Sequence, residues 1–241
     1  MSKSTKLANK ILSLSYTGIS LIGLVILVIS TFNSQRNIVN YDLQRQFIGM
    51  VFVTICIGGI IVGVFPSSCS RLPSLKSGKK THEEKHGEET TIAFIGHHPK
   101  CSSFSGHVFK MRRRTYCAGC TGLVIGALVS LFGVLLYLFY DFNFGENSNL
   151  IFWIGFAAVV CGLLQYQIPD GNNGYVHFFF NVIFPFGAFL LLVGVSRLTG
   201  NFVLESYLLA LTIFWIITRI TLSRLEHKKI CATCLQPCSF L

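Results

Sequence analysis

Residues 120–140 read CTGLVIGALVSLFGVLLYLFY, a run of apolar and small residues without a single charged side chain. A helix of this length extends about 30 Å, which matches the hydrocarbon core of a bilayer. Similar runs recur along the chain, and the full set comprises residues 11–31, 47–65, 120–140, 150–166, 175–196 and 202–220. The sequence therefore predicts an all-α, polytopic membrane protein with about six transmembrane helices.

The overall composition supports the same class of protein. Of the 241 residues, 51% are hydrophobic and 12% are charged, and the mean hydropathy is +0.59. Soluble domains carry about 25% charged residues, so a water-soluble enzyme of this length is excluded. The chain is long enough for one membrane domain of several helices, but not for a large soluble domain in addition.

Lysine and arginine are divided unequally between the two sides of these spans. Of the 20 Lys and Arg residues, only Arg36, Arg45 and Arg197 fall on the side that lacks the termini. The positive-inside rule therefore predicts a multi-pass protein of the cell membrane with cytoplasmic N- and C-termini. The basic residues at 110 and 112–114 predict contact with anionic lipid headgroups. A nucleic-acid partner is not indicated, because this basic run lacks interleaved aromatic residues.

Composition divides the chain into five segments. Residues 1–65 are expected to form an N-terminal transmembrane hairpin, and 66–95 a charged, disordered cytosolic linker with too few apolar residues to form a core. Residues 96–120 form a zinc-ribbon-like Cys/His loop, in which 102–116 is expected to be a short hairpin or helix. Residues 121–220 form a four-helix transmembrane region, and 221–241 a cytosolic cysteine-rich tail.

The loop holds the most specific motif in the sequence. His98-x2-Cys101 is followed after fifteen residues by Cys117-x2-Cys120, the ligand spacing of a zinc ribbon. Cytosolic thiols stay reduced, so grouped cysteines there indicate metal or redox chemistry rather than disulfides. These four residues are the predicted metal ligands, with His97 and His107 as alternatives. Zinc is the expected ion, and an iron–sulfur cluster is the alternative.

A second group of possible ligands lies in the predicted tail. It reads His227-x3-Cys231-x2-Cys234-x3-Cys238, and Cys69 is an alternative member. This density of ligands suggests a second metal site. A tail with exposed thiols is the other interpretation, because a short segment shields a metal poorly.

The sequence around the second pair of cysteines resembles a known family. Residues 117–122 read CAGCTG, with Gly126 on the next helical turn, and residues 96–104 read GHHPKCSSF. With the later pair Asp170-Gly171, these elements resemble domain of unknown function 2085, a prokaryotic family of small polytopic membrane proteins, of which this chain would be a divergent member. The resemblance implies a membrane protein with a Cys/His site and supplies no activity.

Other polar and small residues within or beside the spans have simpler interpretations. Asp170 and His177 lie near the cytoplasmic interface, where water should reach them, and a helix-capping or packing role is expected. Glu205, close to the outer end of the last span, is expected to be solvated. Gly122-x3-Gly126 should allow close packing between helices of this chain.

Together these observations predict an integral membrane protein of unknown biochemical activity. Its cytosolic Cys/His site would be structural, with a scaffold role or recruitment of an unidentified protein partner. Four protein ligands fill the coordination sphere of zinc and leave no open position, so no catalytic residue is assigned. A membrane-bound thiol or metal redox enzyme that uses Cys117 and Cys120 is the alternative, and a small-solute transporter is the third possibility.

Overall fold

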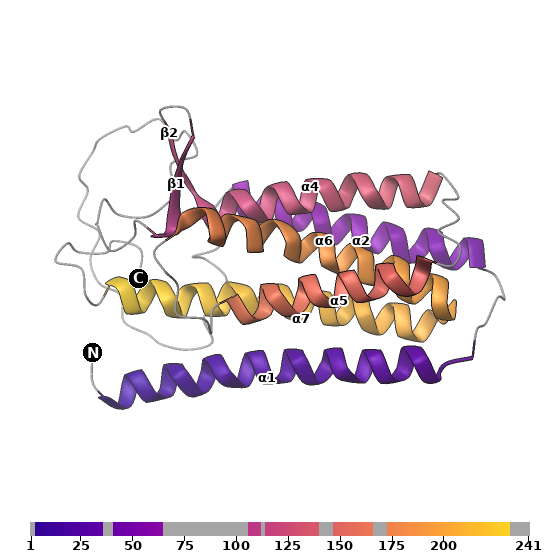
Figure 1. The fold of residues 1–241 in the computed structure, drawn as a ribbon, viewed down its shortest axis with the longest axis horizontal. Helices are drawn as coiled ribbons and strands as arrows, with labels where there is room; N and C mark the ends of the chain where they lie inside the picture. The colour runs from indigo at the N-terminus through magenta and orange to yellow at the C-terminus, as the bar shows by residue number, and fades with distance from the viewer. Residues whose placement is uncertain are drawn as a thin grey trace, which may run out of the picture.

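The computed structural model describes residues 3–35, 41–64, 106–111, 114–139, 147–165 and 173–231. Over these residues the chain forms six helices and one two-stranded hairpin (Figure 1). In chain order the elements are α1 (Lys3–Asn33), α2 (Tyr41–Val64), β1 (Val108–Met111), β2 (Arg114–Cys117), α4 (Ala118–Phe139), α5 (Ser148–Leu164), α6 (Gly174–Thr199) and α7 (Phe202–Cys231).

The helices have the length and composition of membrane spans. Five of them, α1, α2, α4, α6 and α7, are long and apolar enough to cross a bilayer. The remaining helix, α5, is also apolar but has only 17 residues, or about 26 Å at 1.5 Å per residue. The predicted helical architecture is thereby confirmed, with five candidate membrane spans where the sequence predicts about six. The predicted metal-binding cap is not shown by the described residues.

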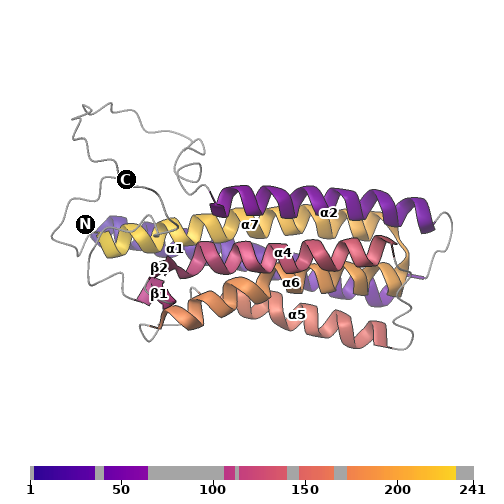
Figure 2. The ribbon, with the colours of Figure 1, turned by 90° about the horizontal axis from the view of Figure 1, so that it is seen from above.

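The helices form one bundle in which α6 is central. It packs against α5, α4 and α7 and also contacts β1. The two N-terminal helices lie on different sides of this bundle: α1 packs mainly on α7, and α2 packs on α4 and α7. Figures 1 and 2 show that the start of α1, the end of α7 and the hairpin all lie at one end of the bundle.

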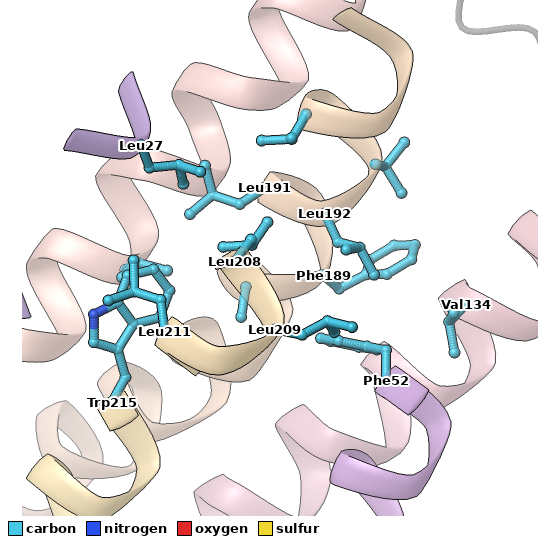
Figure 3. Packing of buried hydrophobic residues seen from close by; sticks show 14 of the residues in the cluster. Leu27, Phe52, Val134, Phe189, Leu191, Leu192, Leu208, Leu209, Leu211 and Trp215 are labelled. Atoms are coloured by element: carbon cyan, nitrogen blue, oxygen red, sulfur yellow. The ribbon is translucent and has the colours of Figure 1, made fainter. Parts of the chain in front are cut away.

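A single apolar core joins all six helices. Trp215 is its largest fully buried side chain, followed by Phe52, Phe152 and Phe184. The centroid of the Phe52 ring lies 6.3 Å from that of Phe189. Figure 3 shows how α1, α2, α4, α6 and α7 contribute to this cluster through Leu27, Phe52, Val134, Phe189, Leu191, Leu192, Leu208, Leu209, Leu211 and Trp215. The helices of residues 1–65 therefore share their core with those of 121–220.

Polar contacts tie the middle of α1 to α7. The hydroxyls of Ser20 and Thr218 lie 3.2 Å apart, and the Trp215 indole donates to the Ser20 carbonyl at 3.4 Å. The Tyr207 hydroxyl donates to the Gly23 carbonyl at 3.0 Å. These contacts set the rotation of α1 about its own axis, which an apolar surface alone would leave poorly specified.

Glycines bring α4 against α6. A Cβ added at Gly122 would lie 2.5 Å from the Phe178 carbonyl oxygen, and one at Gly126 would collide with the Val182 carbonyl oxygen. The backbones of these helices therefore approach more closely than any larger residue would allow. The predicted packing role of this glycine pair within the chain is confirmed.

Two segments differ in their bounds from the sequence-based expectation. Helix α7 continues well past residue 220 and includes His227 and Cys231, so the predicted tail begins as a continuous helix. Residues 102–116 are expected from the sequence to form either a short hairpin or a short helix. Their described part forms an antiparallel hairpin in which Val108 lies opposite Cys117. The linker 66–95 lies outside the described residues.

Candidate functional site

The hairpin is seated on the first turn of α6. Phe109, on β1, is buried, and its ring contacts those of Tyr116, Tyr175 and Phe178 at centroid distances of 5.8, 5.7 and 5.0 Å. A Cβ on Gly174 would collide with the carbonyl oxygen of Val108. The hairpin therefore reaches the bundle through an aromatic cluster and one close backbone approach.

This seating leads to a first prediction. Gly174→Val is expected to displace the hairpin and to cost about 1–3 kcal/mol, the usual penalty for overpacking. The matched control is Gly119→Ala, because a Cβ at that position meets no atom within 4 Å. Trypsin cleavage at Lys110 and Arg114 measures the displacement. Equal cleavage rates in the two variants would contradict the seating described here.

Cys117 and Cys120 lie where the hairpin passes into α4. Cys117 is the last residue of β2 and is 6% exposed, and Cys120 is half-buried in the first turn of α4. Two residues separate them, so both thiols belong to the same strand-to-helix junction. The other predicted ligands, His98 and Cys101, and the alternative His97 lie outside the described residues.

The structure directs His107 toward α6 and α7. Its ring centroid is 4.7 Å from that of His177, and its Nε2 is 4.0 Å from a Glu226 carboxylate oxygen. Within the described ranges, no three His, Cys, Asp or Glu side chains are grouped so that they could hold a metal ion. The described residues therefore do not bring the alternative ligand His107 together with Cys117 and Cys120.

The second predicted cluster is divided by the end of α7. His227 and Cys231 belong to its last turns, whereas Cys234, Cys238 and the alternative Cys69 lie outside the described residues. The existence of a second metal site therefore stays a prediction.

A buried arginine organises the bundle beside the hairpin. Arg219, on α7, is 5% exposed. It donates to the Gly162 carbonyl at 2.6 Å, to Gln165 Oε1 at 2.9 Å and to Asn181 Oδ1 at 2.7 Å. Its guanidinium carbon lies 4.5 Å from the centroid of the Phe184 ring. Arg219 thus joins α7 to α6 and to the last turn of α5, where a helix leaves carbonyl groups without intrahelical partners.

The direction of these hydrogen bonds determines the tautomer of His177. Arginine can only donate, so Gln165 Oε1 must accept and Gln165 Nε2 must face away from it. That amide nitrogen lies 2.6 Å from His177 Nδ1 and donates to it. His177 therefore carries its proton on Nε2. Metal-bound histidines normally donate through their other nitrogen, and Arg219 prevents this at His177 by fixing the Gln165 amide.

Asn181 extends the same arrangement. Its Oδ1 accepts from Arg219, and its Nδ2 donates to the His177 carbonyl at 2.6 Å. Asn181 lies four residues after His177, so the two residues belong to one face of α6. The expectation that water reaches His177 is wrong, because the side chain is 5% exposed. It is covered by His107 and held by Gln165, which fits the predicted packing role.

Sequence reasoning missed Arg219 and Gln165 as site residues. Both residues fall near the ends of predicted spans, Gln165 in 150–166 and Arg219 in 202–220. The available signal was weak: a charged side chain still inside a long apolar helix, at a depth where ionisable groups are costly.

Glu205, expected to be solvated, is 0% exposed, so that expectation is wrong. The physical reason is the tight corner between α6 and α7. Gly200, at φ 56°, ends α6, and α7 begins two residues later. The first turn of α7 therefore lies beside α2 and α6 instead of beyond the end of the bundle.

Comparisons with protein-family models, with curated proteins and with solved structures find no significant match. The resemblance to domain of unknown function 2085 therefore stays a prediction.

Proposed function

We propose that this chain is a multi-pass protein of the cell membrane with cytoplasmic termini and a structural zinc site at the hairpin end of its bundle. The site would hold the cytosolic loop in one conformation and present it to a protein partner. The observation that carries the proposal is the placement of Cys117 and Cys120 at the junction between a docked hairpin and α4.

The two thiols suit half of a zinc site. Zinc in structural sites takes four tetrahedral ligands, commonly two pairs that are each separated by two residues. Cys117 and Cys120 form one such pair, and His98 with Cys101 is the proposed second pair. Bound zinc would supply a cross-link between the two halves of the loop. In small zinc-binding peptides such a site contributes on the order of 10 kcal/mol to folding.

The proposed orientation rests on the distribution of basic residues. Lys and Arg concentrate on the side predicted to hold both termini, and the start of α1 and the end of α7 lie at the hairpin end of the bundle. The basic residues near the hairpin would also contact anionic lipid headgroups. A zinc-held loop at that surface is a suitable scaffold, because its shape would not depend on a large soluble core.

The zinc site is tested by metal analysis of the full-length protein purified in detergent. Cys117→Ser and Cys120→Ser are each expected to remove about one zinc ion per chain and to expose the loop to protease. Cys161→Ser is the matched control, because Cys161 is an exposed residue on α5, away from the junction. It should retain both the zinc content and the protease pattern.

The redox alternative predicts a different result. A catalytic thiol has a depressed pKa and reacts rapidly with alkylating reagents. Loss of Cys117 would then leave the protease pattern unchanged, and one cysteine of the unmodified protein would be alkylated much faster than the others. That combination would overturn the structural zinc site in favour of a thiol enzyme.

A further inference from the structure

A buried carboxyl lies at the end of the bundle opposite the hairpin. Glu205 is in the first turn of α7, where its backbone N–H donates to the Asn201 carbonyl at 3.1 Å. Its side chain is completely inaccessible to solvent. Ionisable side chains at such depth in a helical membrane protein are costly and commonly functional.

Two polar side chains from neighbouring helices lie next to this carboxyl. They are Gln44 on α2 and Ser196 on α6. The Ser196 hydroxyl is 2.8 Å from the Tyr137 hydroxyl of α4. Within the part of the chain that the structure describes, neither Glu205 carboxylate oxygen has a partner in good hydrogen-bonding geometry, and the same holds for Gln44 Nε2. Helices α2, α4, α6 and α7 thus converge on this polar group, in which Ser196 and Tyr137 are hydrogen-bonded to each other whereas the Glu205 oxygens and Gln44 Nε2 make no hydrogen bond of good geometry with the described residues.

Two arginines at the same end of the bundle, Arg45 and Arg197, lie against the ring of Tyr137. The guanidinium carbons of Arg45 and Arg197 each lie 5.8 Å from the centroid of the Tyr137 ring. Arg45 also pairs with the exposed Asp42 at 3.6 Å. Among the described residues, no basic side chain forms an ion pair with Glu205. Its charge is therefore not balanced by a described side chain in direct contact.

We propose that Glu205, Gln44 and Ser196 form a binding site for one monovalent cation, H⁺ or Na⁺. A carboxylate without a compensating charge is strongly disfavoured in an apolar interior. A proton on the carboxyl removes that charge, and a bound Na⁺ balances it. Carboxylate, amide and hydroxyl oxygens are ligands that hard cations prefer.

The site is tested with dicyclohexylcarbodiimide, an apolar reagent that modifies protonated carboxyls. The full-length protein in detergent is treated at several pH values, with and without NaCl, and modification of Glu205 is measured by mass spectrometry. If the cation is H⁺, modification falls about tenfold per pH unit above the titration midpoint and does not respond to Na⁺. If the cation is Na⁺, added NaCl protects the carboxyl at constant pH, whereas KCl at the same ionic strength protects it less.

Three variants complete the test. Asp42→Asn removes the exposed carboxyl of the same region and should leave the modification unchanged. Glu205→Gln should abolish it, keep the unfolding temperature of the parent protein and remove the dependence of that temperature on pH or Na⁺. Glu205→Ala should lower the unfolding temperature under all conditions, because it also removes packing. The proposal is overturned if Glu205 is never modified, if its modification ignores both pH and Na⁺, or if Glu205→Gln is as unstable as Glu205→Ala.

Discussion

Replacing Arg219 with leucine is expected to lower the free energy of unfolding by about 3–5 kcal/mol. This is the usual cost of removing one partner from a buried interaction that involves a charge. The substitution leaves the Gly162 carbonyl, Gln165 Oε1 and Asn181 Oδ1 without the donor that they share. Each buried acceptor that loses its partner costs about 1–3 kcal/mol. Chemical denaturation in mixed micelles, followed by tryptophan fluorescence, measures the loss.

Two further variants distinguish the contribution of the Arg219 hydrogen bonds to stability from that of its positive charge. Arg219→Lys keeps a positive charge but cannot present the same fork of donors, so most of the loss should remain. Arg224→Leu is the matched control, because Arg224 lies on the same helix and its buried Nη2 makes no hydrogen bond with the described residues. It should change stability by less than about 1 kcal/mol. Equal effects of Arg219→Leu and Arg224→Leu would contradict the central role of the network.

Gly126→Val is expected to destabilise the bundle, because it places a branched side chain where α4 meets the backbone of α6. Gly122→Val acts one turn earlier, where a Cβ would lie 2.7 Å from that of Asn181. Each change should cost about 1–3 kcal/mol or somewhat more. Together they should separate α4 from α6. An engineered cysteine pair across this interface should then lose its disulfide cross-linking efficiency.

The control for this prediction lies on α2. Gly58 and Gly59 have no heavy atom within 4 Å of an added Cβ, so valine there should be tolerated. Val182 and Pro185 face Gly126, and shortening Val182 to alanine does not relieve the collision, because the obstructing atom is a backbone oxygen. Rescue of Gly126→Val by Val182→Ala would show that side chains, not backbones, limit this interface.

The membrane spans could be predicted because their signal is local. A run such as residues 120–140 is apolar throughout, and length alone indicates that it can cross a bilayer. The position of His177 and Asn181 on one helical face follows from spacing in the same way. Helix ends were less accurate, since α7 continues past residue 220 through a polar segment that carries no stop signal of its own.

The candidate site depends on contacts between distant residues, which spacing does not reveal. Arg219 meets Gly162, Gln165 and Asn181 only after α5, α6 and α7 have packed together. Glu205 looked solvated because it is close to a span end, yet the corner at Gly200 brings it inside the bundle. The spacing of Cys117 and Cys120 was readable because both belong to one short segment, whereas their proposed partners lie elsewhere in the loop.

The contacts between α1 and α7 have a consequence for biosynthesis. Helix α1 is joined to α7 across sequence separations of 184 to 198 residues. In the membrane protein proposed here, α1 must therefore wait among lipids until α7 has been synthesised, with the Ser20 hydroxyl and the carbonyls of Ser20 and Gly23 not yet paired with α7. A nascent chain that ends before α7 never forms these contacts, so its α1 keeps polar groups without the partners that they have in the bundle.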